Sequence, residues 1–150
     1  LGLSVHFLIM GFPGEDAWRA QADAMGLAGR VTFTGGIPYD LAPVYLGVGD
    51  IAVSPKMSET EGNGKLLNYM AAGLPTVTFQ TPVAMEILGD LGLYAQPGDS
   101  TDLARALAAL VGDRGLRAER GRLLRARAID NFSWRATGGR LAAIYDSLAR

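Results

Sequence analysis

The chain has 150 residues, of which 49% are hydrophobic and 19% charged, which is enough apolar surface for one core and excludes a disordered chain. A net charge of −1 gives no support for nucleic acid as a partner, and the lack of cysteine excludes disulfides, zinc ribbons and thiol nucleophiles. No apolar run approaches the roughly 18 residues that span a bilayer, and no signal peptide is evident, so we expect a cytoplasmic protein.

Short apolar runs alternate with helical segments through the first two thirds of the chain. The first run, 3–10, is almost continuously apolar, which is typical of a strand buried on both faces. The further runs with strand character are 31–34, 51–53, 75–79 and 93–95. The helices expected between them are 15–25, a short one capped by Asp40 and holding Leu41, Val44 and Tyr45, then 64–72 and 84–88.

The last third is predicted to be entirely helical. Asp99 or Ser100 caps a helix with leucines one turn apart, and Ser133 caps the final helix, whose apolar stripe includes Trp134 and Tyr145 as packing residues. Alternating strands and helices indicate a parallel sheet covered on both faces. The sequence therefore predicts an α/β, doubly wound, Rossmann-like domain over 1–150, with the helical tail 113–150 belonging to it.

Charge is unevenly distributed along the chain. Residues 1–112 carry five Lys/Arg and eleven Asp/Glu, whereas residues 113–150 carry nine Arg and four acidic residues. Two interpretations of the basic tail stay open. Its arginines form a solvated helix face, or they dock on an anionic membrane or an acidic partner domain.

Glycine-containing loops after the strands are the places where such a sheet binds ligands, beyond the carboxyl ends of its strands. Three candidates are 11–14, 35–36 and 58–64. In the third, Gly62 and Gly64 allow ligand oxygens to approach backbone N–H groups at a helix start, which suits phosphate. Lys56 or Lys65 adds a positive charge there.

Acidic side chains share that third loop. Glu59 and Glu61 accept hydrogen bonds, as sugar hydroxyls require, so the loop combines the features of a diphosphate site and a polyol site. That combination indicates a nucleotide sugar. The alternatives are a tight turn that uses the two glycines and a helix-start role for Glu61.

Other familiar sites fit the sequence poorly. Lys65 is followed by Leu66 instead of Ser or Thr, which argues against a Walker loop, and Gly11–Gly14 does not complete a dinucleotide fingerprint. His6, the single histidine, is expected to be a hydrogen-bonded strand residue. No cluster has metal-ligand spacing, so neither a metal nor a cofactor is predicted.

The order of segments resembles the C-terminal domain of the group 1 retaining GT-B glycosyltransferases, and the resemblance covers nearly the whole chain. It rests on a strand followed by Gly11, on a GL…RV.F.G segment from Gly26 to Gly35, and on the stretches EGNG and MAAGLPTV. The last two resemble the family signature EGFG…EAMAAG.PVV. Ser54-Pro55 stands where the family usually has Pro-Ser.

The resemblance implies roles for residues of the third loop and the helix after it. Gly62, Asn63 and Gly64 would meet the diphosphate and the transferred sugar through backbone N–H groups, and Glu61 would hold sugar hydroxyls. Asn68 stands where the family has the second Glu of its E-x7-E motif, which holds the ribose. Because no strict E-x7-E exists here, that contact rests on a neutral amide.

Earlier loops have implied roles as well. The 35–39 segment, with Gly35, Ile37 and Tyr39, would border the base, and Gly11 would line the cleft. The family's Arg…Lys pair, first strand and helix, and acceptor domain would precede residue 1, which indicates a truncated chain.

The resemblance implies a half-enzyme. Its substrate would be a nucleoside diphosphate sugar such as a UDP- or GDP-hexose, with the catalytic contribution from Glu61 and Lys65, no metal, and peripheral membrane contact of the longer protein as an option. The alternatives are a degenerate GT-B-like binding domain without activity and a GT-B-fold sugar-nucleotide epimerase.

Overall fold

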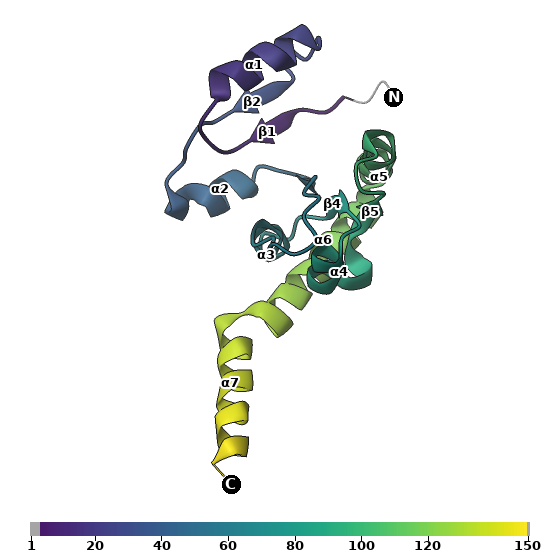
Figure 1. Cartoon of the computed structure of the whole chain (residues 1–150). Helices are drawn as coiled ribbons and strands as arrows, with labels where there is room; N and C mark the ends of the chain where they lie inside the picture. Colours follow the sequence, from purple (N-terminus) through teal and green to yellow (C-terminus); the bar gives the residue numbers. More distant parts are fainter. Residues whose placement is uncertain (1–3, 150) are drawn as a thin grey trace. The chain divides into compact units, whose positions relative to one another are not determined.

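The computed structural model describes residues 4–149, and the chain divides into two compact units, Leu1–Gly49 and Asp50–Arg150. Each unit contains its own parallel sheet, of two strands in the first and three in the second. Strand–helix alternation runs through both units (Figure 1). The α/β class with parallel, helix-covered strands is therefore as predicted, although the hydrogen-bonded strands form two sheets.

The first unit is a strand–helix–strand element followed by a short helical segment. Strands β1 (Phe7–Ile9) and β2 (Val31–Phe33) pair in parallel, and α1 (Glu15–Ala24) connects them and packs on β2. A 3-10 turn (Tyr39–Leu41) and α2 (Ala42–Leu46) follow.

Two expectations for this unit are wrong. The strand expected over 3–10 covers only Phe7–Ile9, and its ends are 37% and 46% exposed, because β1 has one hydrogen-bonded neighbour and α1 packs on β2. The expected Leu3 start lies outside the described residues. Asp40 caps no helix, because Pro38 holds the N-cap position of the 3-10 turn and its carbonyl accepts from the Leu41 N–H at 3.0 Å.

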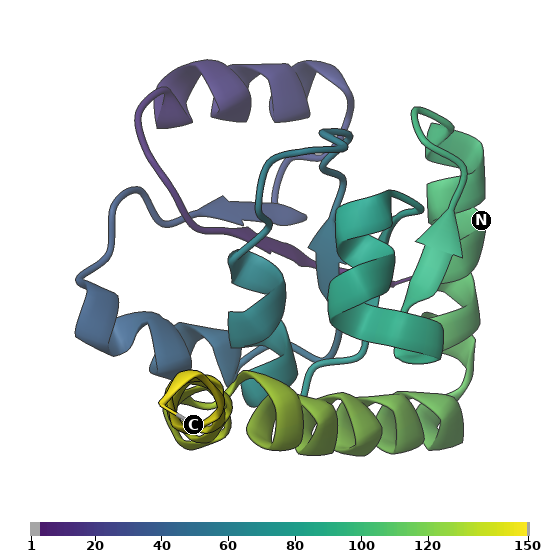
Figure 2. The ribbon, with the colours of Figure 1, turned by 60° about the horizontal axis from the view of Figure 1, so that its bottom comes forward.

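The second unit contains most of the regular structure. Its sheet has the order β3 (Ala52–Ser54), β4 (Thr76–Phe79) and β5 (Leu93–Ala95), all parallel. The connecting helices are α3 (Lys65–Ala71) and α4 (Pro82–Leu88), and the chain then continues through α5 (Ser100–Gly112), α6 (Arg114–Phe132) and α7 (Trp134–Leu148) (Figure 2).

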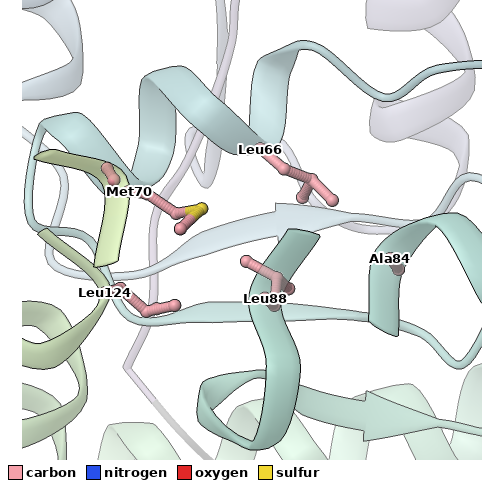
Figure 3. Packing of buried hydrophobic residues seen from close by; sticks show 6 residues of the cluster. Leu66, Met70, Ala84, Leu88 and Leu124 are labelled. Atoms are coloured by element: carbon pink, nitrogen blue, oxygen red, sulfur yellow. The ribbon is translucent and has the colours of Figure 1, made fainter. Parts of the chain in front are cut away.

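The core of this unit lies between α3, α4 and α6. Both crossovers proceed in the same direction across the sheet, so α3 and α4 are expected on one face of it; they contact each other, and α6 packs across α3. Six buried residues from these three helices form the cluster, namely Leu66, Met70, Ala84, Leu88, Leu124 and Ala128 (Figure 3). Helix α5 packs on β4 and β5, and β4 is buried at all four positions, which is expected of a strand covered on both faces.

Helix caps in the second unit follow the sequence. Asp99 accepts hydrogen bonds from the N–H groups of Thr101 and Asp102, which confirms it as the cap of α5. Ser133 accepts from the Ala136 N–H and caps α7, as predicted. These caps satisfy N–H groups that have no partner within the helix.

Three arginines of α6, within the basic tail, have a structural role that neither interpretation of the tail anticipated. Arg117 donates to the carbonyls of residues 110 and 111 at the end of α5, and Arg127 donates to those of residues 86 and 87 in α4. Arg120 donates to the Asp90 carbonyl, just after α4. Carbonyls at helix ends lack intrahelical partners, so these arginines complete the ends of neighbouring helices.

The apolar stripe of α7 is exposed in the described part of the chain. Trp134 is 92% exposed and Tyr145 is 65% exposed, so the expectation that they are packing residues is wrong here. Helix α7 packs against α6, from which Ser133 separates it with an extended backbone (φ −65°, ψ 153°). Within residues 4–149, no helix is both long and apolar enough to cross a membrane.

Candidate functional site

The loop between β3 and α3, residues 55–64, contains half of the predicted site residues. Lys56 links the start of this loop to its later part. Its Nζ lies 3.0 Å from the Glu61 carboxylate and donates to the Gly62 carbonyl at 3.1 Å. The Glu61 N–H donates to Ser58 Oγ at 3.2 Å. A lysine and a glutamate expected to bind different parts of one ligand are thus neighbours in the same loop.

The Asn63 side chain anchors this loop to the end of β3. Its side chain points inward, is 5% exposed, and donates from Nδ2 to Ser54 Oγ at 3.1 Å. Ser54 is fully buried at the end of β3, and its backbone carbonyl accepts from Thr78 Oγ1 of β4 at 2.8 Å. A buried polar chain therefore ties the loop to the ends of two strands, which limits the conformations the loop can adopt.

Gly62 and Gly64 are not required by the fold. Neither has a positive φ, Gly64 having φ −55°, and a Cβ built at either position would meet no atom within 4 Å. The backbone N–H groups of residues 62–64 have no acceptor among residues 4–149. A tight turn does not explain the glycines, since neither has a positive φ and a side chain would fit at either position.

The remaining predicted residues of this unit lie on its surface. Lys65 and Asn68 are exposed and three residues apart on α3, which places both on one face of the helix. Glu59 is exposed in the loop, without the contact to Lys56 that Glu61 makes. Beside Asn68, burial raises the pKa of Tyr69, so this phenol stays protonated at neutral pH.

The predicted residues of the first unit lie at the carboxyl ends of β1 and β2. The Gly11 N–H donates to the Gly35 carbonyl at 3.1 Å, so the structure brings these two residues together. Gly35 has φ +68°, a conformation that favours glycine. Ile37 is half-buried and Tyr39 is 84% exposed.

His6 and the acidic residues indicate little further chemistry. His6 Nε2 lies 2.8 Å from Thr32 Oγ1, which confirms the expected hydrogen-bonded role. Among residues 4–149, no group of three or more His, Asp or Glu side chains is arranged to hold a metal.

Ser54 is a site residue that the sequence analysis did not identify. Two signals for it were present. Ser54-Pro55 reverses the usual Pro-Ser order, and Asn63 stands where the family signature has Phe. Polar residues at positions 54 and 63 can form a hydrogen bond only when the fold brings the end of β3 next to the loop. The Asn63–Ser54 pair was therefore not evident from the spacing of the two residues in the sequence.

The chain is similar to known proteins in sequence and in structure. Residues 2–113 match the family model described as "Glycosyl transferases group 1". A GDP-mannose-dependent alpha-(1-6)-phosphatidylinositol monomannoside mannosyltransferase of Mycolicibacterium smegmatis is 29% identical over 145 residues, which cover 91% of this chain and 38% of that protein. A 2-deoxystreptamine N-acetyl-D-glucosaminyltransferase of Streptomyces fradiae is 31% identical over 122 residues, covering 80% of this chain and 28% of the relative.

Solved structures show the same fold. The HepE protein of Anabaena, in complex with UDP, superposes with a TM-score of 0.84 at 22% identity, covering 95% of this chain and 41% of that one. The sucrose-phosphate synthase of Thermosynechococcus elongatus gives a TM-score of 0.80 at 24% identity, over 94% of this chain and 38% of the other. The chain thus spans less than half the length of these relatives.

Proposed function

Because the chain belongs to the group 1 glycosyltransferase family, we propose that it is the nucleotide-sugar-binding half of a retaining enzyme. That enzyme would transfer a sugar from a nucleoside diphosphate sugar to an acceptor bound by a further domain of the longer protein. Mannosyl- and glucosaminyltransferases among the relatives and UDP in a structural neighbour support a nucleotide-sugar donor. We also propose that the two units act as one donor-binding domain.

The loop of residues 55–64 carries this proposal. The open space beside Gly62 and Gly64, together with the unpaired N–H groups of residues 62–64, suits the oxygens of a diphosphate. Lys56 and Lys65 supply positive charge beside this cradle, and Glu61 supplies an acceptor for sugar hydroxyls. Groups that suit the diphosphate and a group that suits the sugar thus lie within a few residues of one another.

The catalytic contribution of these groups is electrostatic. As the bond between sugar and diphosphate breaks, negative charge grows on the diphosphate, and donors already fixed in place stabilise it without reorganising. Lys65 and the N–H groups of residues 62–64 would contact that diphosphate. Glu61 would keep its ion pair with Lys56 and accept hydrogen bonds from the sugar hydroxyls with its remaining lone pairs.

The other predicted residues would hold the nucleoside. Asn68, exposed on α3, would hydrogen-bond the ribose diol, and Glu59 would add an acceptor at the loop. Gly11, Gly35, Ile37 and Tyr39 of the first unit would border the cleft and the base. Neither a metal nor a cofactor enters this scheme.

The cellular location of the longer enzyme is part of the same proposal. Absence of cysteine suits a reducing cytoplasm. Several arginines of the basic tail do not bond to the helix ends, Arg122 and Arg125 among them, and both are exposed. They suit a peripheral contact with an anionic membrane.

The test is calorimetric titration of the chain with UDP, GDP, ADP and their glucose and mannose conjugates, without added metal. We expect saturable binding of one nucleotide series. Gly64→Ala should weaken it about tenfold because a methyl group enters the cradle. Glu61→Gln should weaken binding of the sugar conjugates relative to that of the free nucleotide.

Gly138→Ala is the matched control, since a Cβ there also meets nothing within 4 Å and the residue lies in α7. No binding of any nucleotide would contradict the proposal and favour a degenerate binding domain. Binding that Gly64→Ala and Gly138→Ala leave equally intact would contradict the placement of the cradle.

A further inference from the structure

A concave surface lies at the carboxyl ends of β4 and β5. It is an open hollow of about 630 Å³. All its lining residues belong to the second unit, where they lie in β5, directly after β4 or β5, or on α4 and α5. The loop of residues 55–64 contributes none of them, so this hollow is separate from the donor cradle.

Two glutamines form the polar part of the hollow. Gln80 directly follows β4 and Gln96 directly follows β5. The two strands are in register at Phe79 and Ala95, and the Gln80 N–H donates to the Ala95 carbonyl at 2.8 Å. The glutamines are therefore next to each other at the sheet edge.

Both side-chain amides are available to a ligand. Gln80 and Gln96 are exposed, and within residues 4–149 the Gln96 amide has no hydrogen-bond partner. The Gln80 amide donates only to Met85 Sδ, at 3.6 Å. A pair of free amides offers donors and acceptors together, and neutral hydroxyl groups need both.

The other polar groups of the hollow are already bonded. Asp102 accepts from the Gln96 backbone N–H through one oxygen, at 2.8 Å, and pairs with Arg105 through the other, at 2.9 Å. The Tyr94 hydroxyl donates to the Gly89 carbonyl at 2.6 Å. No charge is left unpaired to attract an ion, so the hollow suits a neutral ligand.

Apolar side chains complete the walls. Pro82, Met85 and Pro97 line the hollow beside the amides. Apolar surface next to paired amides matches a ring that has C–H groups on one face and hydroxyls at its rim. We propose that this hollow binds a neutral carbohydrate ring through Gln80 and Gln96.

This inference goes beyond the donor function and does not depend on it. A sugar held here would lie at the same carboxyl edge of the sheet as the cradle after β3, because β3 is the other hydrogen-bonded neighbour of β4. That place suits a further sugar of a longer glycan chain.

The test is an NMR titration of the whole chain with methyl α-D-glucopyranoside and with maltose, in the absence of nucleotide. We expect saturable shifts of the backbone amides of Gln80, Gln96 and Asp102, with dissociation constants in the millimolar range, on the order of 10 mM. Gln80→Ala and Gln96→Ala should each weaken binding about fivefold, the size of one neutral hydrogen bond. Circular dichroism checks that these exposed substitutions preserve the fold.

Two controls separate this site from the donor loop. Gly64→Ala should leave sugar binding unchanged, and cyclohexylmethanol, a ring without the neighbouring hydroxyls, should not shift these amides. Absence of shifts at about 50 mM sugar, shifts confined to residues 55–64, or glutamine variants that bind the sugar as tightly as the native chain would overturn the proposal. None of those results would bear on nucleotide binding, which the calorimetric test addresses alone.

Discussion

The two units of the chain use similar local patterns and bury very different amounts of surface. In the second unit β4 is buried at every position, and Leu66, Leu88, Leu110 and Leu124 are completely inaccessible. In the first unit, none of the residues described from 4 to 49 reaches the buried class, and β1 is exposed at both ends. A strand–helix–strand pattern thus specifies local structure in both units, but a core in only one.

This difference separates the candidate site into two parts. The 55–64 loop rests on the buried chain Asn63–Ser54–Thr78, whereas Gly11, Gly35 and Tyr39 belong to the unit with little burial. Burial of apolar surface is the main favourable term in folding, so the second unit should hold its loop far more firmly. Matched substitutions in the two units measure this contrast, and the titration of Tyr94 probes the second unit alone.

The largest effect is expected for core truncation. Leu66→Ala should lower the free energy of unfolding of the second unit by about 3 kcal/mol, because it leaves a cavity beside Met70 and Leu124. Ile9→Ala, at a strand position that is 46% exposed, should lower that of the first unit by less than about 1 kcal/mol. Urea unfolding followed by hydrogen exchange of amides in each unit measures both, and equal losses would refute the contrast.

Matched glycine substitutions come next. A Cβ at Gly121 would overlap the carbonyl oxygen of Gly73, where α6 crosses the end of α3, so Gly121→Ala should destabilise by about 2 kcal/mol. A Cβ at Gly35 meets only the flexible end of Glu15, at 3.0 Å, and the positive φ alone should cost about 1 kcal/mol. Thermal unfolding of the two variants gives the order, and a larger loss for Gly35→Ala would contradict it.

Arginine substitutions test the helix-end hydrogen bonds. Arg127→Met removes two donors from carbonyls at 2.8 and 2.9 Å, and should destabilise by about 1.5 kcal/mol. Arg19→Met in the first unit removes an exposed guanidinium 5.7 Å from the Phe33 ring centre, and should change stability by about 0.5 kcal/mol or less. Urea midpoints of the two variants measure both effects. An Arg127→Met midpoint equal to that of the native chain would contradict the stabilising role of the Arg127 hydrogen bonds.

The smallest effect concerns alkaline pH. Burial, reinforced by the Asp90 charge and opposed by Arg127, raises the pKa of Tyr94 to about 12. Because the folded state holds this proton more tightly than the unfolded state, the Tyr94 contribution is complete below the ordinary pKa of 10 and is lost as pH rises toward 12. Unfolding at pH 9 and pH 11 should show this loss in the native chain. Tyr94→Phe should be less stable at pH 9 and show a smaller decrease, and an identical decrease would assign it to other groups.

Local patterns in the sequence predicted the elements with few errors. Runs of β-branched and apolar residues located all five strands, and Asp99 and Ser133 were recognised as caps because capping depends on neighbours two or three residues away. The family signature located the loop of residues 55–64 for the same reason, since its residues are contiguous. The capping role predicted for Asp40 was wrong because Pro38, two residues earlier, holds the N-cap position of the 3-10 turn.

Contacts distant in sequence were not predictable in this way. Asn63 was expected to contribute its backbone N–H, but the direction of its side chain depends on Ser54, nine residues earlier. The arginines of α6 were interpreted as a surface charge because their carbonyl partners lie up to 41 residues away. Trp134 and Tyr145 were expected to be packed because the periodicity of α7 is amphipathic, and periodicity does not specify what covers the apolar face.

The sequence by itself determined the order of strands and helices, the caps, the α/β class and the loop that holds the candidate donor residues. These depend on backbone preferences and on side chains within a few residues of one another. Tertiary structure alone decided which strand is buried, which arginines close helix ends, that Lys56 pairs with Glu61, and that Gln80 and Gln96 meet at one edge. Burial and hydrogen bonding join segments across the fold, and their free energy depends on distances that only the folded chain sets.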